Sequence, residues 1–107
     1  MNFTSVAVPL KVIGESIYAA SKSAVVTFTQ ILAKELAPYN ITVNALGPNL
    51  IDTNAIKNLS EERRKNILQC QAIHRLGELP DITNVIDFFL KSESNFITGQ
   101  VIYLGGI

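Results

Sequence analysis

The sequence has 107 residues, with nine basic and nine acidic side chains and a formal net charge of zero, so it lacks the basic surface of a nucleic-acid-binding domain. Its only cysteine, Cys70, and its only histidine, His74, cannot form an internal disulfide or a cysteine/histidine metal site. No apolar run is long enough to span a bilayer, and no basic-then-apolar leader is visible. We therefore expect a cytoplasmic chain of one domain or less, with no nucleic-acid or membrane partner.

The composition is apolar for so short a chain. Hydrophobic residues make up 48% of the sequence, and the mean hydropathy is +0.26. Small domains leave much of their surface exposed to water. This excess indicates an apolar surface that another chain covers.

Strand and helix patterns alternate through the first half of the chain. A β-rich run predicts a buried strand over residues 1–7. Apolar residues at helical spacing predict a helix over 16–39, ended by Pro38 and Asn40, and a second short strand over 41–46 is closed by Gly47 and Pro48. The inward face of the long helix is expected to contain Ile17, Ala20, Ala24, Val25, Phe28, Ile31, Leu32 and Leu36.

The second half continues the alternation. A polar helix is expected over 61–73 with Ser60 as its N-cap, a further helix over 81–91, and a last strand over 100–104. The inward residues of the helix over 81–91 are expected to be Ile82, Val85, Ile86, Phe89 and Leu90. A strand–helix–strand–helix–strand order with apolar strands predicts an α/β fold with a parallel sheet. Such a βαβαβ unit is half of a doubly wound fold.

Tyr18 and Lys22 are the residues with the clearest chemical meaning. They lie one turn apart at the start of the long predicted helix, so their side chains share a face. A phenol is a poor base at neutral pH, and an ammonium about 4 Å away favours the phenolate by only about 1 kcal/mol in water. In a partly dried cleft the same pair contributes nearer to about 4 kcal/mol. The pair could therefore exchange protons only within such a cleft, and by itself the spacing also fits a solvated helix face.

Several motifs in order resemble the short-chain dehydrogenase/reductase family. A strand ends in Ser5, which lies 13 residues before Tyr18, the usual interval in that family. The other similar segments are Tyr18-Ala-Ala-Ser-Lys22, Leu32–Pro38, Ile41–Ala45, the loop Pro48–Thr53, Arg75-Leu-Gly-Glu78 and Phe96-Ile-Thr-Gly-Gln100. The resemblance covers the whole chain and implies the C-terminal part of a Rossmann-like doubly wound sheet.

The resemblance implies a role for each of these residues. Tyr18 would be the general acid in carbonyl reduction and the base in alcohol oxidation. Lys22 would favour the phenolate and hold the nicotinamide ribose, while Ser5 would polarise the substrate oxygen. Pro48, the backbone near Ile51, and Thr53 would complete the cofactor contacts. The implied function is NAD- or NADP-dependent hydride transfer between a ketone and an alcohol, because the Tyr-x-x-x-Lys spacing is not that of the family's enoyl reductases.

Two departures from the family pattern bear on this interpretation. Asn49 replaces the usual glycine of the loop, and we expect it to preserve the turn because asparagine tolerates positive φ. No glycine-rich phosphate turn follows a first strand anywhere in the sequence. We therefore expect residues 1–107 to be a partial NAD(P)-binding domain, a truncated chain that is inactive alone and binds the dinucleotide poorly if at all.

An alternative function is that of a non-enzymatic assembly or interaction module derived from a subunit of this family. Under both interpretations we expect a homo-oligomer, or a pairing with a fuller subunit of the family. The expected contacts are the strand edge over 1–7 and the long helix, whose extra apolar residues include Val26. A small carbonyl or alcohol substrate is expected only for the enzymatic interpretation.

Overall fold

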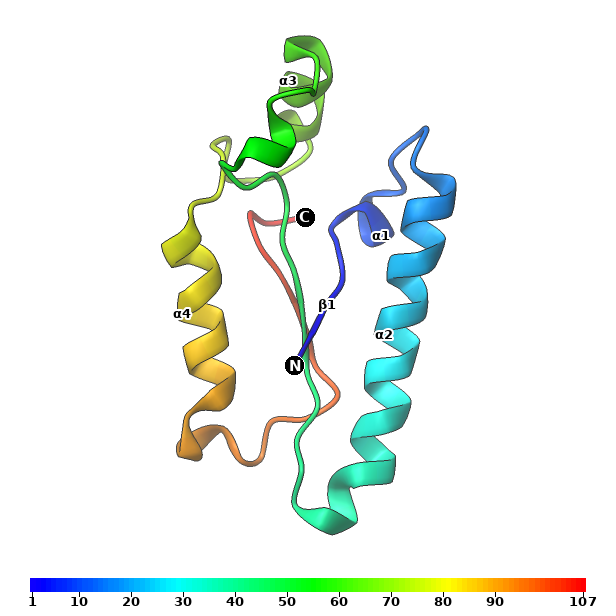
Figure 1. Ribbon diagram of the computed structural model, residues 1–107, viewed down its shortest axis with the longest axis vertical. Helices are drawn as coiled ribbons and strands as arrows, with labels where there is room; N and C mark the ends of the chain where they lie inside the picture. Colours follow the sequence, from blue (N-terminus) through cyan, green and yellow to red (C-terminus); the bar gives the residue numbers. More distant parts are fainter.

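A computed structural model describes all 107 residues. Three strands, β1 (Asn2–Phe3), β2 (Ala45–Gly47) and β3 (Val101–Tyr103), form a parallel sheet in the order β1-β2-β3. Ala45 aligns with Asn2 on one side and with Val101 on the other. Helices α2 (Ser16–Leu36) and α4 (Leu79–Leu90) lie on opposite sides of the strands (Figure 1). The expected parallel α/β fold is therefore confirmed.

The first strand is shorter than the predicted strand over residues 1–7. Its ladder extends as far as the amide of Thr4, which donates to Leu46 O at 2.9 Å. The chain then turns, because Ser5 Oγ accepts from Ala7 N–H at 3.1 Å and its carbonyl accepts from Val8 N–H. A short helix, α1 (Ala7–Leu10), follows. Local hydrogen bonds thus replace the regular ladder after Thr4, with one further bond to the segment after β2, from Val6 N–H to Pro48 O at 3.3 Å.

Helix α2 begins and ends near the predicted residues and passes into a 3₁₀ turn, η1 (Ala37–Tyr39). The face it turns toward the sheet is different from the predicted one. That face is centred on Thr29, which is fully buried and accepts a hydrogen bond from Asn2 Nδ2 at 3.0 Å. Val25, Leu32 and Leu36 lie on this face, as expected. Val26 was expected on the outer surface but is also half-buried. The other apolar residues predicted to face inward are exposed, namely Ile17, Ala20, Ala24, Phe28 and Ile31.

The choice of the buried face of α2 has a physical reason. The helix carries two apolar stripes, and hydropathy alone does not tell which one the sheet covers. The stripe around Thr29 is selected by the contact of Thr29 with Asn2 of β1. The second stripe is left in solvent, where Ile17 is 87% exposed and Phe28 is 57% exposed. We refer to the second stripe, Ile17, Ala20, Ala24, Phe28 and Ile31, as the outer stripe of α2.

The second strand is also shorter than the predicted 41–46. Residues 43 and 44 are held by side chains as well as by backbone bonds. Thr98 Oγ1 accepts from Val43 N–H, and the Asn44 side chain bonds both Ile97 O and Gln100 N–H. The carbonyl oxygens of both residues accept backbone bonds, from Gly99 N–H and Asn2 N–H. The strand proper ends at Gly47, where a Cβ atom would lie 2.4 Å from the Tyr103 ring. A glycine at this position therefore lets β3 pack against β2.

The segments after β2 leave the sheet. A 3₁₀ turn, η2 (Asn54–Ile56), leads to α3 (Glu61–Gln69), which Ser60 caps by accepting from Arg63 N–H at 3.2 Å. The cap was predicted, but α3 ends at Gln69 and not at residue 73. Helix α4 begins two residues earlier than predicted, and on it Leu90 is exposed while Ile82 and Phe89 are buried as expected. A last 3₁₀ turn, η3 (Ser92–Ser94), precedes β3.

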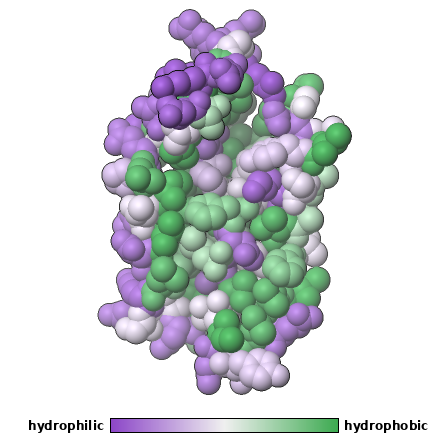
Figure 2. Space-filling view, viewed as in Figure 1, coloured by the Kyte–Doolittle hydropathy of each residue, from purple (hydrophilic) through white to green (hydrophobic).

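The hydropathy of the surface changes along the length of the molecule. In the view of Figure 2 the end that carries α3 is hydrophilic, and apolar residues gather over the strands between α2 and α4. None of the helices combines the length and apolar character that crossing a membrane requires. The hydrophilic end lies beyond the carboxyl ends of the parallel strands, which is where doubly wound folds place their ligands.

Candidate active site

Ser5 and Tyr18 line one cavity of about 230 Å³ at the carboxyl end of β1 and β2. Its walls come from the turn after β1, the start of α2, the loop after β2 and the inner face of α3. Pro48, Asn49 and Leu50 form the wall contributed by the loop. The structure thus brings together two of the three catalytic residues that the sequence predicts, although they come from different elements. The complete lining is Thr4, Ser5, Val6, Ala7, Val12, Glu15, Tyr18, Pro48, Asn49, Leu50, Leu59, Arg63 and Ile67.

Ser5 is 8% exposed and is positioned by the turn that ends β1. Its hydroxyl oxygen accepts a hydrogen bond from Ala7 N–H at 3.1 Å. A serine hydroxyl has one proton to donate and two acceptor sites. The proton of Ser5 is therefore free to be donated to a ligand oxygen in the cavity, while the Ala7 contact fixes the position of the oxygen atom.

Tyr18 and Lys22 occupy the face of α2 that also carries Thr29. Tyr18 lies beyond the end of the sheet, so the residue is 46% exposed and its side chain lines the cavity. Lys22 Nζ lies 5.8 Å from the centre of that ring and donates to Phe3 O at 3.2 Å. The backbone oxygen of Lys22 accepts from Thr4 Oγ1 at 2.8 Å. Two contacts thus fasten this turn of α2 to β1, and the ammonium adds positive charge beside the phenol.

The loop after β2 is tied to the turn after β1, because Val6 N–H donates to Pro48 O at 3.3 Å. Ile51 lies opposite Gly77 in a parallel bridge. The two hydrogen bonds of this bridge belong to the residues on either side of Ile51, because Gly77 N–H donates to Leu50 O and Asp52 N–H donates to Gly77 O. The N–H and C=O of Ile51 itself make no hydrogen bond. They are therefore available to a planar amide ligand.

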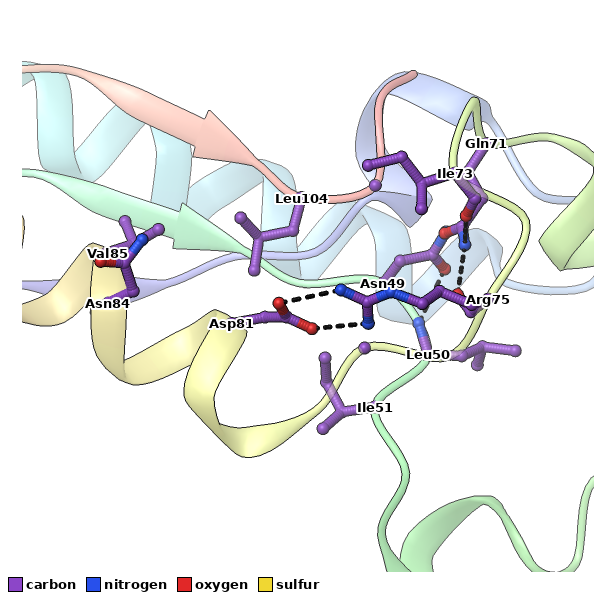
Figure 3. A pocket seen from close by; sticks show the side chains of 12 residues that line it. Asn49, Leu50, Ile51, Gln71, Ile73, Arg75, Asp81, Asn84, Val85 and Leu104 are labelled. Atoms are coloured by element: carbon purple, nitrogen blue, oxygen red, sulfur yellow. Dashed lines mark hydrogen bonds and ion pairs between the residues drawn. The ribbon is translucent and has the colours of Figure 1, made fainter.

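In this loop, the backbone of Asn49 and the position of Thr53 differ from what the sequence predicted. Asn49 does not adopt positive φ, since Lys11 and Asn40 are the only such non-glycine residues. Its side chain holds the turn instead, with Oδ1 accepting from Leu50 N–H at 2.9 Å. Thr53 is exposed, precedes η2 and does not line the cavity that contains Ser5 and Tyr18. The side chain of Ile51 points into a second cavity behind the loop (Figure 3).

The sequence did not reveal an ion pair in the lining of the first cavity. Arg63 of α3 bonds Glu15, which lies just before α2. The charged run over 61–65 forms no ion pair within its own helix. Glu15 and Arg63 are separated by 48 positions, so no local pattern could have identified them as partners.

The parallel sheet with helices on both sides is a Rossmann-like α/β fold, and Ser5, Tyr18 and Lys22 lie near the carboxyl end of β1. A family model described as "Enoyl-(Acyl carrier protein) reductase" matches residues 1–106. The chain belongs to the short-chain dehydrogenase/reductase family.

Among curated proteins, the chain is similar to a 3-oxoacyl-(acyl-carrier-protein) reductase of Buchnera aphidicola, with 40% identity over 93 residues. The corresponding reductase of Thermotoga maritima is 41% identical over the same length. Each alignment covers 87% of this chain and 38% of the relative. The chain therefore spans less than half the length of the curated relatives that it matches.

Solved structures agree with this placement. A 3-oxoacyl-(acyl-carrier-protein) reductase from Brucella melitensis superposes with a TM-score of 0.86 at 35% identity, covering 99% of this chain and 40% of that one. A blue fluorescent protein from a metagenomic library, solved in complex with NADPH, gives a TM-score of 0.87 at 28% identity, covering 98% and 42%. The fold is thus one that holds a nicotinamide cofactor in another protein.

Proposed function

We propose that this chain supplies the catalytic wall of an NAD(P)-dependent oxidoreductase that interconverts a ketone and an alcohol. The observation that carries the proposal is the shared cavity of Ser5 and Tyr18, with Lys22 one helical turn behind the phenol. A serine proton and a phenol proton converging on one space can both bond a single carbonyl oxygen. Residues 1–107 would be one part of a dinucleotide-binding domain.

The residues fit a nicotinamide. Pro48 and Leu50 offer an apolar surface beside the cavity, and the unpaired N–H and C=O of Ile51 match the donor and acceptor of a carboxamide. Lys22 Nζ has donor capacity beyond its bond to Phe3 O and would bond ribose hydroxyls. Thr53 is a weaker candidate for a cofactor contact, because it lies outside the cavity. When bound, the nicotinamide supplies or accepts the hydride.

The roles of the side chains follow from the same geometry. Ser5, held by Ala7 N–H, donates to the substrate oxygen and fixes the orientation of the carbonyl. Tyr18 gives its proton to that oxygen during reduction and takes it back during oxidation. Lys22 stabilises the phenolate that remains after the transfer. In a closed cleft this ammonium is several times more effective than in water.

The substrate class is a ketone, with 3-oxoacyl compounds as the first candidates. The curated relatives are named for reduction of 3-oxoacyl groups, whereas the matching family model has the name of an enoyl reductase. Tyr18 and Lys22 stand four positions apart, the spacing that we associate with ketone chemistry. A neutral carbonyl also suits the cavity, because Glu15 compensates the charge of Arg63.

A segment exchange tests the proposal. Residues 1–107 replace the matching segment of the Thermotoga maritima reductase, and oxidation of NADPH and NADH is followed with acetoacetyl thioester and with a crotonyl thioester. We expect reduction of the ketone, loss of about 10²–10⁴-fold in a Tyr18→Phe variant, and normal activity in a matched Tyr39→Phe variant. A folded hybrid that reduces neither substrate, or only the crotonyl compound, would contradict the proposal.

The 107-residue chain alone is expected to show no reductase activity. Tyr18 is 46% exposed, so water weakens the effect of Lys22 on Tyr18. Turnover of any ketone by the purified chain would contradict this expectation.

A second candidate function, assembly, is favoured by the outer stripe of α2. An apolar stripe on a long helix is suited to packing against its counterpart in a second copy. We propose that the chain is a homo-oligomer through this stripe, whether or not it is catalytic. The edge of β1, where Phe3 is exposed, is a further contact candidate.

A further inference from the structure

We propose that Asn49 and Gln71 form a positioning pair that holds the nicotinamide-facing loop, residues 48–53, in place. Gln71 lies just after α3 and is 4% exposed. Its side-chain oxygen accepts a hydrogen bond from Asn49 Nδ2. The cofactor role of the pair rests on the proposed function, whereas the mechanical coupling between the two residues does not.

The orientation of both amide groups is determined by their backbone partners. Gln71 Nε2 faces two carbonyl oxygens, those of Ile73 and Arg75, the latter at 2.7 Å, and only a donor satisfies them. Gln71 Oε1 is therefore left to face Asn49. Asn49 Oδ1 accepts from Leu50 N–H, so its Nδ2 donates to Gln71. Every polar atom of the buried Gln71 amide is thus used.

Gln71 is itself anchored to the segment after β3. The neighbouring amides of Ala72 and Ile73 donate to Gly106 O and Gly105 O at 2.8 and 2.9 Å. A Cβ atom on Gly105 would lie 2.6 Å from Gln71 Oε1. Because Gly105 also has a φ of +90°, a larger residue at this position is disfavoured in two ways. The glycine leaves room for the Gln71 side chain.

The loop is consequently held from two directions. Gly77 bonds the backbone on both sides of Ile51, and the Asn49–Gln71 pair holds the residue next to Pro48. Figure 3 shows Asn49 and Gln71 near one another, with Arg75 reaching across to Asp81. The cavity that these residues line has a volume of about 210 Å³. Asn49 also lines the cavity that contains Ser5 and Tyr18. Movement of Asn49 would therefore shift the unpaired N–H and C=O of Ile51, the proposed carboxamide contacts.

The pair also accounts for the departure from the family pattern. A glycine at position 49 has no side chain to bond Gln71, and a buried glutamine oxygen without a partner is costly. Asn49 and Gln71 thus form a matched combination in this chain. Because each side chain is the partner of the other, the effects of replacing them are expected to be less than additive.

The first test is amide hydrogen exchange in the 107-residue chain. Variants Asn49→Gly, Gln71→Leu and the double variant are compared with the unchanged chain. We expect the protection factor of Leu50 N–H to fall about tenfold in Gln71→Leu, because its acceptor Asn49 loses its partner. The double variant should fall less than the sum of the two singles. The amides of Thr4 and Ala45, bonded within the sheet, serve as internal references and should change less than twofold.

A second variant distinguishes a positioning role from a general packing role. Asn49→Asp has nearly the same shape and keeps an acceptor for Leu50, but its ionised carboxylate faces Gln71 Oε1 without a proton. When protonated below about pH 4, it can donate to Gln71, so the Leu50 protection factor should recover as the pH falls. The other charged groups near this site are Arg75 and Asp81 behind the loop and Glu15 and Arg63 in front of it. The control is the double variant Asn49→Asp with Gln71→Leu, which keeps all of these charged groups. Its Leu50 protection factor should not recover as the pH falls.

The cofactor role is tested with reduced nicotinamide mononucleotide, a probe that needs no glycine-rich phosphate turn. Its titration is followed by NMR shifts of residues 48–53, and we expect affinity several-fold weaker in Gln71→Leu than in the unchanged chain. Binding by the unchanged chain, combined with unaltered loop exchange and affinity in the variants, would overturn the positioning pair alone. Absence of binding by the unchanged chain would overturn the nicotinamide role of this loop, whereas the proposed function is tested separately by the segment exchange. Equal loss of protection at Leu50, Thr4 and Ala45 would identify Gln71 as a packing residue and overturn the proposal.

Discussion

The ammonium of Lys22 is shared between the edge of the sheet and the phenol of Tyr18. It donates to the carbonyl oxygen of Phe3 at 3.2 Å and lies 5.8 Å from the centre of the Tyr18 ring. A lysine bound to β1 in this way is held close to the tyrosine before any ligand arrives. The bond to β1 thus positions the Lys22 ammonium beside the Tyr18 phenol, where the proposed chemistry needs it.

Replacing Lys22 by methionine should separate function from stability. Methionine keeps most of the apolar stem but removes the charge and the bond to Phe3 O. Because this bond is exposed, we expect a loss of less than about 1 kcal/mol in the free energy of unfolding. In the hybrid enzyme, activity should fall by at least about 10²-fold, the scale of a lost proton-transfer group. Urea unfolding and NADPH oxidation measure the two effects, with Lys34→Met as the matched control.

Replacing Thr29 by valine tests the contact that selects the buried face of α2. The shape is preserved, but Asn2 Nδ2 loses its acceptor in a fully buried position. We expect destabilisation of about 1–2 kcal/mol, measured by urea unfolding. The exposed Thr27→Val change on the same helix should have almost no effect. Equal stability of the two variants would show that the Asn2 contact does not select this face.

A charge on the outer stripe of α2 should dissociate the assembly. Phe28→Glu places a carboxylate in the middle of the exposed apolar surface, where burial against a second copy would be unfavourable. We expect a smaller sedimentation coefficient with unchanged circular dichroism. Arg64→Glu, on exposed α3, should leave the assembly intact. If Phe3→Asp dissociates the oligomer while Phe28→Glu does not, the edge of β1 is the contact instead.

The ion pair between Arg75 and Asp81 should make stability depend on acid. The hydrogen bond from Arg75, aided by Glu78 N–H, lowers the pKa of Asp81 to about 2. A carboxylate whose pKa is lower in the folded state stabilises the fold above its unfolded pKa of about 3.9. This contribution is lost as the pH falls from about 4 to about 2. Solvent reaches both side chains, so the effect should be small.

Thermal unfolding between pH 5 and pH 2 measures that dependence. Asp81→Asn keeps an acceptor for Glu78 N–H but removes the charge, so its melting temperature should fall less over this range than that of the unchanged chain. Asp87→Asn, on the same helix and without an ion pair, should follow the unchanged chain. Parallel curves for the unchanged chain and Asp81→Asn would show that the ion pair has no net effect.

Sequence by itself determined the order of the elements, the parallel sheet and the family of this protein. These depend on local patterns, such as the helical spacing over 16–39 and the interval between Ser5 and Tyr18, which the chain carries within short segments. It also identified Ser60 as a cap, because capping joins residues three positions apart. It placed Tyr18 and Lys22 on one face for the same reason.

Tertiary structure alone decided which apolar stripe of α2 is buried, where β1 and β2 end, and how the site is closed. The helical spacing of apolar residues treats Phe28 and Val25 alike. Only the position of the sheet and the Asn2–Thr29 bond determine that the face with Val25 is buried and the face with Phe28 is exposed. Glu15 meets Arg63, and Asn49 meets Gln71, across separations of 48 and 22 positions. Such partners are chosen by the folded geometry, since a side chain satisfies its hydrogen bonds with whatever the fold brings near it.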